Sequence, residues 1–153
     1  MKITFPHMGN TYISAKALLD DIGVEYIIPP YNNKKTLEIG TKYAPEMACI
    51  PLKINLGNYI QAHEMGADTI LITGGRGPCR FGYYCEMSKE ILADANYNMD
   101  VITLDGPNGD MKKFLEKVKK LAGGYNIYKI LKVIKNTTMV AKRVDEIEKL
   151  TFK

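Results

Sequence analysis

The sequence predicts an α/β fold, a doubly wound, mostly parallel four-stranded sheet with helices on both faces and extra C-terminal helices. The first observation behind this prediction is that short apolar runs alternate along the chain with amphipathic stretches of helical spacing. The second is that parallel strands need crossover connections, which are nearly always right-handed helices. A chain of 153 residues suits one core, so we expect a single domain, 1–153, with the helices of residues 125–152 packed on it.

Four apolar runs are the predicted strands, at residues 2–7, 24–30, 67–75 and 100–107. Proline cannot continue a ladder of hydrogen bonds, so the two prolines that end the second run stop that strand. The third run, ADTILITGG, is nearly all apolar at its centre, as expected when helices cover both faces of the sheet. With helical stretches between the runs, this order is Rossmann- or flavodoxin-like.

Helices are predicted between the strands and after the last one. Residues 12–23 have helical spacing and end at a glycine. A second helix begins near Pro51, because proline suits the first helical turn, and the residues before it, 31–50, carry no assigned element. The apolar face of this second helix consists of Leu52, Leu56, Tyr59 and Ala62. The other predicted helices cover residues 86–96, 110–124, 127–136 and 139–150.

Composition and charge argue against several classes of function. The chain has 21 Lys and Arg against 17 Asp and Glu, and a net charge of +4 argues only weakly for an anionic partner. No basic stripe with interleaved aromatic residues is present, so we expect no nucleic-acid partner. No apolar run matches a signal peptide or the ~20 residues of a membrane span. We therefore expect a cytoplasmic protein with no membrane partner.

Four loops collect at the carboxyl ends of the predicted strands, where doubly wound sheets bind their ligands. Their sequences are PHMGN, PPYNN, TGGRGPC and DGPNG. All are rich in Gly, Pro or Asn, the residues of site-forming turns. The third loop contains Cys79 and leads into Cys85, so two of the three cysteines belong to this edge.

Two of the three cysteines lie near predicted helix N-termini. Cys49 directly precedes the Pro51 helix, and Cys85 lies at the start of the helix of residues 86–96. The positive end of a helix dipole favours thiolate over thiol. In a cytosolic chain, an odd number of cysteines indicates catalytic, metal-binding or simply unbonded thiols rather than a disulfide framework. The C-x5-C spacing of Cys79 and Cys85 also differs from the C-x-x-C of a thioredoxin-like couple.

Three interpretations of the thiols stay open at the level of the residues. Zinc takes four ligands in a structural site, or three and a water in a catalytic one. Thiolate-rich sites also suit iron and sulfide, and three cysteines match a cluster with one iron open to an exchangeable ligand. A lone cysteine is more often a small buried hydrophobe. The spacing fits neither a ferredoxin nor a zinc ribbon, so it does not choose among them.

Three further residues of the rim are weaker candidates. His7 follows the first strand and could supply a ligand or a proton, although a hydrogen-bonded structural histidine is the commoner role. Arg76 and Arg80 flank Cys79 and could neutralise an anionic cluster or bind an anion, although loop arginines are often only solvated. No Walker or dinucleotide-binding glycine pattern accompanies them.

Two cysteine motifs in residues 45–87 resemble those of a known family. A P-E-x-x-C-x-P-x-K element surrounds Cys49, and a G-P-C-R-x-G-x-Y element contains Cys79. Together they resemble the motif block of the activase-related proteins allied to the 2-hydroxyacyl-CoA dehydratase and benzoyl-CoA reductase superfamily. The likeness extends more weakly to the flanking segments KITFPHMGN and YKILKVIKN.

The resemblance implies an iron–sulfur electron-transfer protein. In that superfamily the lobes are Rossmann- or flavodoxin-like, and the cysteines hold a [4Fe-4S] or larger double-cubane cluster that receives low-potential electrons from an ATP-dependent activase. It implies Cys49, Cys79 and Cys85 as the cluster ligands. A cluster at the rim is exposed, so we expect oxygen sensitivity and pairing across the cysteine edge, as a homodimer or with a second-lobe subunit. The alternative is a non-catalytic module that binds zinc or an anion.

The match covers only the first lobe of this superfamily. Relatives continue with a second lobe, which forms an acyl-CoA pocket in the dehydratases and has no counterpart in these 153 residues. The resemblance therefore leaves open whether the chain is a reductase or dehydratase component. The actin-like ATPase portion fused to some relatives is also missing, so ATP binding is not expected here.

Overall fold

The computed structural model describes residues 1–74, 80–104, 116 and 127–151. Its strands form one sheet in the order β2-β1-β3-β4, and all three neighbouring pairs are parallel. This confirms the predicted α/β fold of the Rossmann or flavodoxin type. The strands are β1 (Ile3–Thr4), β2 (Tyr26–Ile27), β3 (Thr69–Thr73) and β4 (Asp100–Leu104), each inside a predicted apolar run.

Strand β3 is central in the sheet. It pairs with β1 through Ile3↔Thr69 and Thr4↔Ile70, and with β4 along its whole length. Ile70 packs in one hydrophobic cluster and Leu71 in another, because successive side chains of a strand point to opposite faces. The near-continuous apolar run that predicted this strand is thus explained by helices on both sides.

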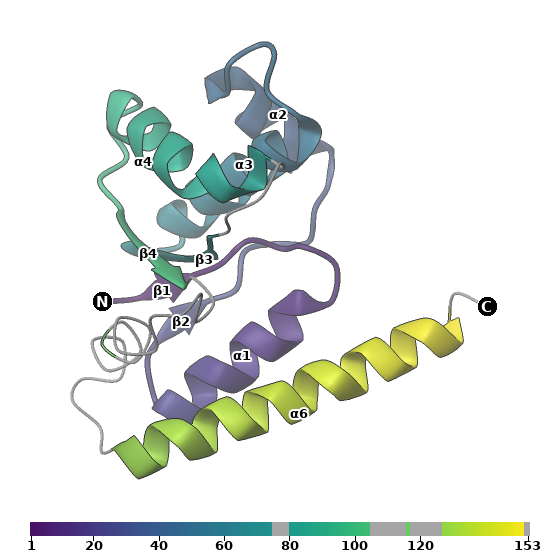
Figure 1. Ribbon diagram of the computed structural model, residues 1–153. Coiled ribbons are helices and arrows are strands. Elements are labelled where there is room, and N and C mark those ends of the chain that lie inside the picture. The colour runs from purple at the N-terminus through teal and green to yellow at the C-terminus, as the bar shows by residue number, and fades with distance from the viewer. Residues whose placement is uncertain (75–79, 105–115, 117–126, 152–153) are drawn as a thin grey trace.

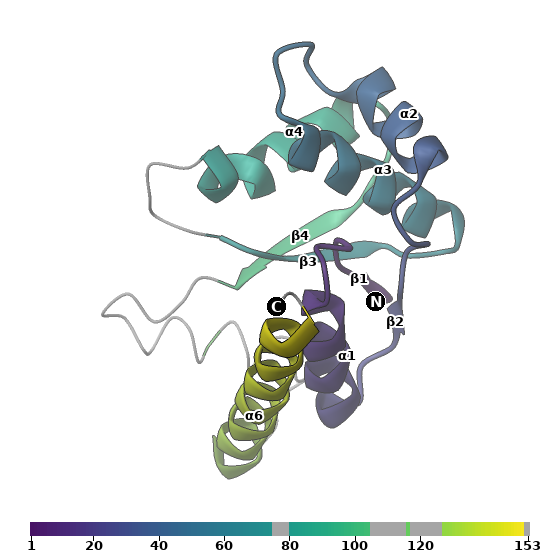
Figure 2. The same cartoon turned by 90° about the vertical axis from the view of Figure 1, so that its right-hand side faces the viewer.

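The helices form two layers around the sheet, as the two views show (Figures 1 and 2). One face carries α2 (Lys34–Tyr43), α3 (Ile50–Glu64) and α4 (Tyr84–Asp94), with the short 3-10 helix η1 (Arg80–Tyr83) leading into α4. The other face carries α1 (Thr11–Ile22) and α6 (Ile127–Thr151). Among the described helices, none is long and apolar enough to cross a membrane.

Helix α2 is not predicted by the hydrophobic pattern, and its start depends on a capping box. Asn33 Oδ1 accepts the Thr36 backbone N–H at 3.1 Å, and Thr36 Oγ1 accepts the Asn33 backbone N–H at 3.4 Å. These bonds satisfy two N–H groups at the helix start. The usual signature of such a box ends in Glu or Gln, whereas here it ends in Thr, so this signal is weak in the sequence.

Helix α6 corrects the prediction of two separate C-terminal helices, because it is continuous from Ile127 to Thr151. Asn136, Thr137 and Thr138 lower the helical propensity at its middle, but none of them is a helix breaker. Thr138 Oγ1 donates to the Ile134 carbonyl at 2.8 Å, and packing on α1 buries Val133 beside Ile22. The predicted helix of residues 110–124 lies outside the described residues, apart from residue 116.

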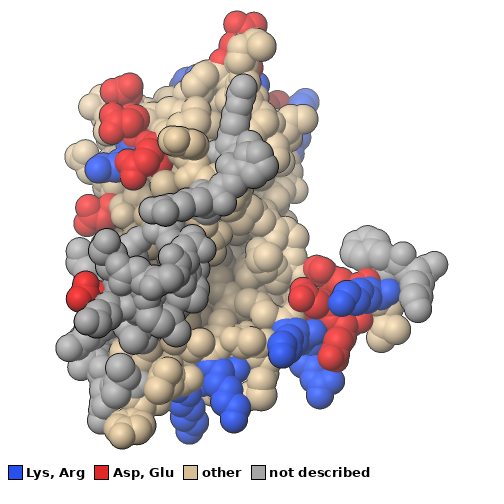
Figure 3. Space-filling model, viewed as in Figure 1, with Lys and Arg blue, Asp and Glu red and all other residues tan. Residues whose placement is uncertain are grey.

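Charged side chains on α6 form a mixed, solvated surface. In Figure 3, Lys and Arg gather along α6 at the bottom of the view, and Asp and Glu join them toward its C-terminal end. Lys132, Lys135 and Lys142 are all exposed. These lysines therefore form part of a solvated face of the helix.

Helices α2 and α3 cross with their backbones in contact. A Cβ at Gly40 would lie 1.6 Å from the carbonyl oxygen of Lys53, and a Cβ at Gly57 would lie 2.0 Å from that of Thr36. Only glycine fits at either position, so each helix presents a glycine to the backbone of the other. Because Lys53 belongs to the first turn of α3, the contact supports the end of α3 at which Cys49 lies.

Candidate functional site

Cys49 is the N-cap residue of α3. Its backbone is extended, with φ −68° and ψ 153°, and its carbonyl accepts the N–H groups of Leu52 and Lys53 at 3.1 and 3.3 Å. Pro51 lies in the first turn, as predicted, where its missing N–H costs nothing. The Cys49 side chain is exposed. A thiol in this position lies at the positive end of a 15-residue helix.

Cys85 is the second residue of α4, which follows η1 directly. It is half-buried and packs against the hydrophobic cluster that contains Tyr59 and Tyr84. Its Sγ lies 3.8 Å from the carbonyl oxygen of Gly82, which accepts a weak S–H hydrogen bond. This thiol, too, belongs to the first turn of a helix, so both thiols that the structure describes are at helix starts.

The Tyr84 side chain joins these two helix starts. Its hydroxyl, on the first residue of α4, contacts the Sγ atom of Cys49 at the start of α3. The ring is 3% exposed and lies 5.1 Å from the ring of Phe81 in η1. Because Tyr84 is the first residue of α4, its contact joins the start of α4 to the start of α3.

Below these thiols, three buried side chains have polar atoms without a hydrogen-bond partner among the described residues. They are the Tyr59 hydroxyl and Asn55 Nδ2 on α3 and the Ser88 hydroxyl on α4. Tyr59 is 0% exposed. Burial raises the pKa of its hydroxyl far above the usual range, and the charge of the nearby Cys85 thiolate raises it further. Tyr59 therefore stays protonated and keeps an O–H donor close to Cys85.

The third cysteine lies in a part of the chain that the structure does not describe. Cys79 and Arg76 both fall within residues 75–79, and Arg80 is described only as the backbone start of η1. Within the described ranges, no group of three or more Cys, His, Asp or Glu side chains could hold a metal ion. The two described thiols need a further ligand to form a metal centre.

His7 belongs to a separate polar network at the same edge of the sheet. Its backbone N–H donates to Asn58 Oδ1 at 3.3 Å, Asn58 Nδ2 donates to Asn32 Oδ1 at 2.8 Å, and Asn32 Nδ2 donates to the His7 carbonyl at 2.8 Å. These three bonds form a closed ring of donors and acceptors. The ring ties the end of β1 to the loop before α2 and to α3.

The His7 imidazole is packed rather than presented to a ligand. It is 5% exposed and lies between the rings of Tyr12 and Tyr31, at centroid distances of 4.7 and 4.9 Å. Burial lowers the pKa of His7 and a hydrogen bond with the Pro29 backbone partly opposes this, so the neutral form is favoured. This placement supports the structural interpretation of His7 over a role as ligand.

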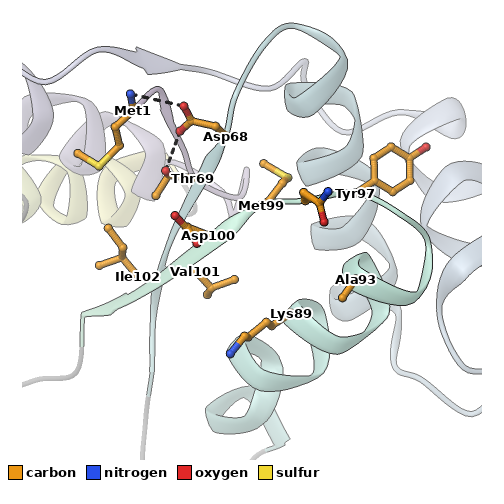
Figure 4. Close-up of a pocket in the computed structure, with 11 residues that line it drawn as sticks. Met1, Asp68, Thr69, Lys89, Ala93, Tyr97, Met99, Asp100, Val101 and Ile102 are labelled. Carbon is orange, nitrogen blue, oxygen red and sulfur yellow. Dashed lines mark hydrogen bonds and ion pairs between the residues drawn. The ribbon is translucent and has the colours of Figure 1, made fainter.

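One cavity among the described residues lies at the end of the strands opposite to the thiols. Figure 4 shows the residues that line it. It has a volume of about 780 Å³ and lies between β4 and α4, with Lys89 and Asp100 among its lining residues. Asp68, its other carboxylate, already accepts the Lys2 N–H at 2.8 Å and the Thr69 hydroxyl at 2.7 Å. It also pairs with the amino group of Met1 at 3.5 Å. The interactions of the Asp68 carboxylate therefore stabilise the fold.

A smaller cavity of about 270 Å³ lies near the carboxyl ends of β1, β3 and β4, on the α1 side of the sheet. Its walls are mostly apolar and include Phe5, Leu18, Leu71 and Leu104. The thiols belong to α3 and α4 on the other face (Figure 2). Neither cavity therefore includes a cysteine.

Exposed apolar side chains flank both thiols. Met47 and Ile50, on either side of Cys49 in the chain, are 87% and 62% exposed, and Tyr83, two residues before Cys85, is 71% exposed. The surface around the thiols therefore includes these three exposed apolar side chains.

The sequence pointed to Cys49 and Cys85 but not to the two tyrosines beside them. Tyr59 is recognisable only as a core position of its helix, and Tyr84 only as the last residue of the G-P-C-R-x-G-x-Y element. Their proximity to the thiols arises from the packing of α3 against α4.

Comparison of the chain with family models, with curated proteins and with solved structures gave no match. The resemblance to a known family therefore depends on the two cysteine motifs alone.

Proposed function

We propose that this chain is an iron–sulfur cluster-binding electron-transfer protein, with Cys49, Cys79 and Cys85 as the cluster ligands. The observation that carries the proposal is the contact between the Tyr84 hydroxyl and Cys49 Sγ, which places two thiols at adjacent helix starts. Two cysteines that served only as core residues would be buried, whereas Cys49 is exposed and Cys85 half-buried. Cys79 enters as the third ligand from the sequence motif.

The described residues fit an anionic sulfur centre. Two helix N-termini direct their positive ends toward the thiols, and dipoles of this sign stabilise thiolates and a negatively charged cluster. Tyr84 supplies a hydroxyl group beside the Cys49 sulfur, and Tyr59 belongs to the cluster against which Cys85 packs. A [4Fe-4S] or double-cubane cluster, when bound, would accept and pass on single electrons. The protein residues hold the sulfurs, orient them and surround them with donors.

The surface around the thiols supports a partner at this edge. An exposed Cys49 would leave a cluster open to solvent and oxygen, and the exposed side chains of Met47, Ile50 and Tyr83 offer apolar area for a covering subunit. We expect a homodimer or a second-lobe subunit in this place. The motif resemblance adds an ATP-dependent activase as the electron donor, and gives no basis for naming a substrate.

Anaerobic reconstitution with iron and sulfide tests the proposal. The wild-type chain should become brown and bind several irons and sulfides, while Cys49→Ser, Cys79→Ser and Cys85→Ser should each lose most of them, because a hydroxyl is a poor ligand for soft iron. Met47→Ser, an exposed change two residues from Cys49, is the matched control and should retain the cluster. A colourless wild-type protein that binds zinc instead would favour the alternative metal-binding module and refute the electron carrier.

A separate experiment tests whether the surface around the thiols binds a partner. Light scattering of the reconstituted protein should give at least a dimer, and Tyr83→Ser should weaken the association without removing iron. A holoprotein that remains monomeric, without an added subunit, at every concentration would argue against the homodimer.

A further inference from the structure

The chain changes direction across the sheet between β1 and β3. From β1 it runs through α1 to β2 on one side, and from β2 it returns through α2 and α3 to β3 on the other side. Helices α1 and α3 therefore lie on opposite faces of the sheet (Figure 2). In open parallel sheets, the crevice at such a change of direction, beyond the carboxyl ends of the strands, is the usual place for a ligand.

The cavity of about 270 Å³ lies at this crevice, on the α1 face of the sheet. Its walls include Phe5 directly after β1, Thr73 at the end of β3 and Leu104 at the end of β4. Helix α1 provides another wall through Ala15 and Leu18. Strands and helices from both halves of the chain thus enclose one space.

The side chains that line this cavity define the chemistry of a ligand. Among the described residues, no charged side chain belongs to the walls, and the polar ones all have hydroxyl groups, namely Thr11, Tyr12, Ser14, Thr73 and Thr137. Burying a charge without a partner is costly, so the cavity favours a neutral, mainly apolar molecule. Since an apolar cavity of about 150 Å³ holds benzene, one of about 270 Å³ suits a molecule of about ten carbon atoms.

Thr137 of α6 supplies this cavity with a polar group that the fold does not use. Its Oγ1 is buried, and no described residue forms a hydrogen bond with it. The neighbouring Thr138 hydroxyl, by contrast, donates to the Ile134 carbonyl, a common bond for a threonine inside a helix. A buried hydroxyl without a partner is costly, and valine would fill the same space without that cost. The Thr137 hydroxyl gains a partner when a ligand with a hydroxyl or carbonyl group occupies the cavity.

From these observations we propose that the cavity between α1, α6 and the ends of β1, β3 and β4 binds a neutral, mainly apolar small molecule with one hydrogen-bonding group, which Thr137 recognises. The cavity lies on the opposite face of the sheet from the helices that carry Cys49 and Cys85. The proposal therefore does not depend on a cluster, and the protein should bind this ligand whether or not it assembles iron and sulfide.

The probe for the first experiment is 2-naphthol, a neutral bicyclic aromatic alcohol of the required size. Added to the metal-free, reduced full-length protein, it should shift the methyl NMR signals of Leu18, Leu71 and Leu104, which line the cavity. The signals of the exposed Met47 and Ile50 should stay unchanged. The charged analogue 2-naphthoate should bind about tenfold more weakly or worse, because the walls offer no counter-charge.

Three results of this titration would overturn the proposal. Leucine signals that do not move show that the cavity is not a site. Shifts that concentrate at Met47 and Ile50 show binding to the exposed apolar surface alone. Equal affinity for 2-naphthoate shows that the site does not select a neutral ligand.

Two variants test the cavity walls and the hydroxyl separately. Ala15→Leu, which fills the cavity from α1, should abolish the leucine shifts while the amide NMR spectrum remains that of a folded protein. Thr137→Val should weaken 2-naphthol binding about two- to tenfold, the effect of one hydrogen bond, and leave the affinity for naphthalene unchanged. Thr138→Val, at the exposed neighbouring position, is the matched control and should bind 2-naphthol as the wild type does.

The outcomes of these variants distinguish the parts of the proposal. Unchanged 2-naphthol binding by Ala15→Leu overturns the cavity as the site. If Ala15→Leu does not fold, Ser14→Leu fills the cavity from the same helix and is judged by the same result. Unchanged 2-naphthol binding by Thr137→Val, or an equal loss for naphthalene, overturns the recognition by Thr137.

Discussion

The network around His7 and the site around Cys49 and Cys85 lie at the same edge of the sheet, yet they differ in how their polar groups are satisfied. Around His7, three hydrogen bonds close a ring through Asn32 and Asn58. Around the thiols, the buried Tyr59 hydroxyl has no partner in the described part of the chain. The His7 network is complete, whereas the thiol region contains a buried donor that has no acceptor among the residues that the structure describes.

This difference bears on the proposed ligand site. A satisfied polar network stabilises a fold, whereas an unsatisfied buried donor destabilises it and is retained where something else needs it. Of the rim residues that the sequence proposed, His7 belongs to the satisfied network. Cys85 packs against the cluster that contains Tyr59, whose hydroxyl has no partner among the described residues.

The largest effect should come from Gly40→Ala, which would disturb both regions at once. Helix α3 carries Asn58 for one region and follows Cys49 for the other, and a Cβ at Gly40 would collide with its backbone. We expect a loss of about 3 kcal/mol or more in the free energy of unfolding, the upper end for an overpacked interior. Urea unfolding of this variant beside Thr41→Ala, on the exposed neighbouring position, measures it. Equal stability of the two variants would show that the helices can separate without cost.

A smaller effect separates the two regions from each other. Asn58 and Asn55 are both buried on α3, but Asn58 donates and accepts in the His7 ring while Asn55 Nδ2 has no partner among the described residues. Asn58→Leu should cost about 1 to 3 kcal/mol of unfolding free energy, because it leaves the His7 N–H unpaired. Asn55→Leu should be neutral or stabilising. The same urea experiment compares them, and equal losses would contradict the division into complete and incomplete regions.

The smallest effect should be the pH dependence contributed by His7. Burial lowers its pKa below the 6.5 of an unperturbed histidine, so the unfolded chain binds the proton more tightly than the folded one. The contribution of His7 to stability should therefore be constant above pH 6.5 and should decline as the pH falls from 6.5 through the lowered folded pKa. Urea unfolding at pH 8, 6 and 5 should show a shallower decline for His7→Phe than for the wild type. If the unfolding free energy of both proteins declines in parallel with pH, the protein interior tolerates the protonated form of His7.

Much of the architecture could be predicted because it depends on local patterns. The four strands and helices α1, α3 and α4 follow from apolar spacing, Pro51 and Gly23. Helix α2 was missed because it is short and mostly polar and its start depends on the Asn33 cap. The break predicted within α6 was wrong because Asn and Thr lower propensity without stopping a helix that packs on a neighbour. The region of Cys79 and Arg76 stays a prediction.

The order of the elements and the presence of thiols at two helix starts were determined by the sequence alone, because both depend on residues only a few positions apart. What the tertiary structure decided is which distant groups meet. Cys49 and Tyr84 are 35 positions apart, and His7 and Asn58 are 51 apart. No periodicity encodes such a pairing, since it results from how α3 packs against its neighbours and against the sheet. That packing closed the polar ring around His7 and left the Tyr59 hydroxyl without a partner among the described residues.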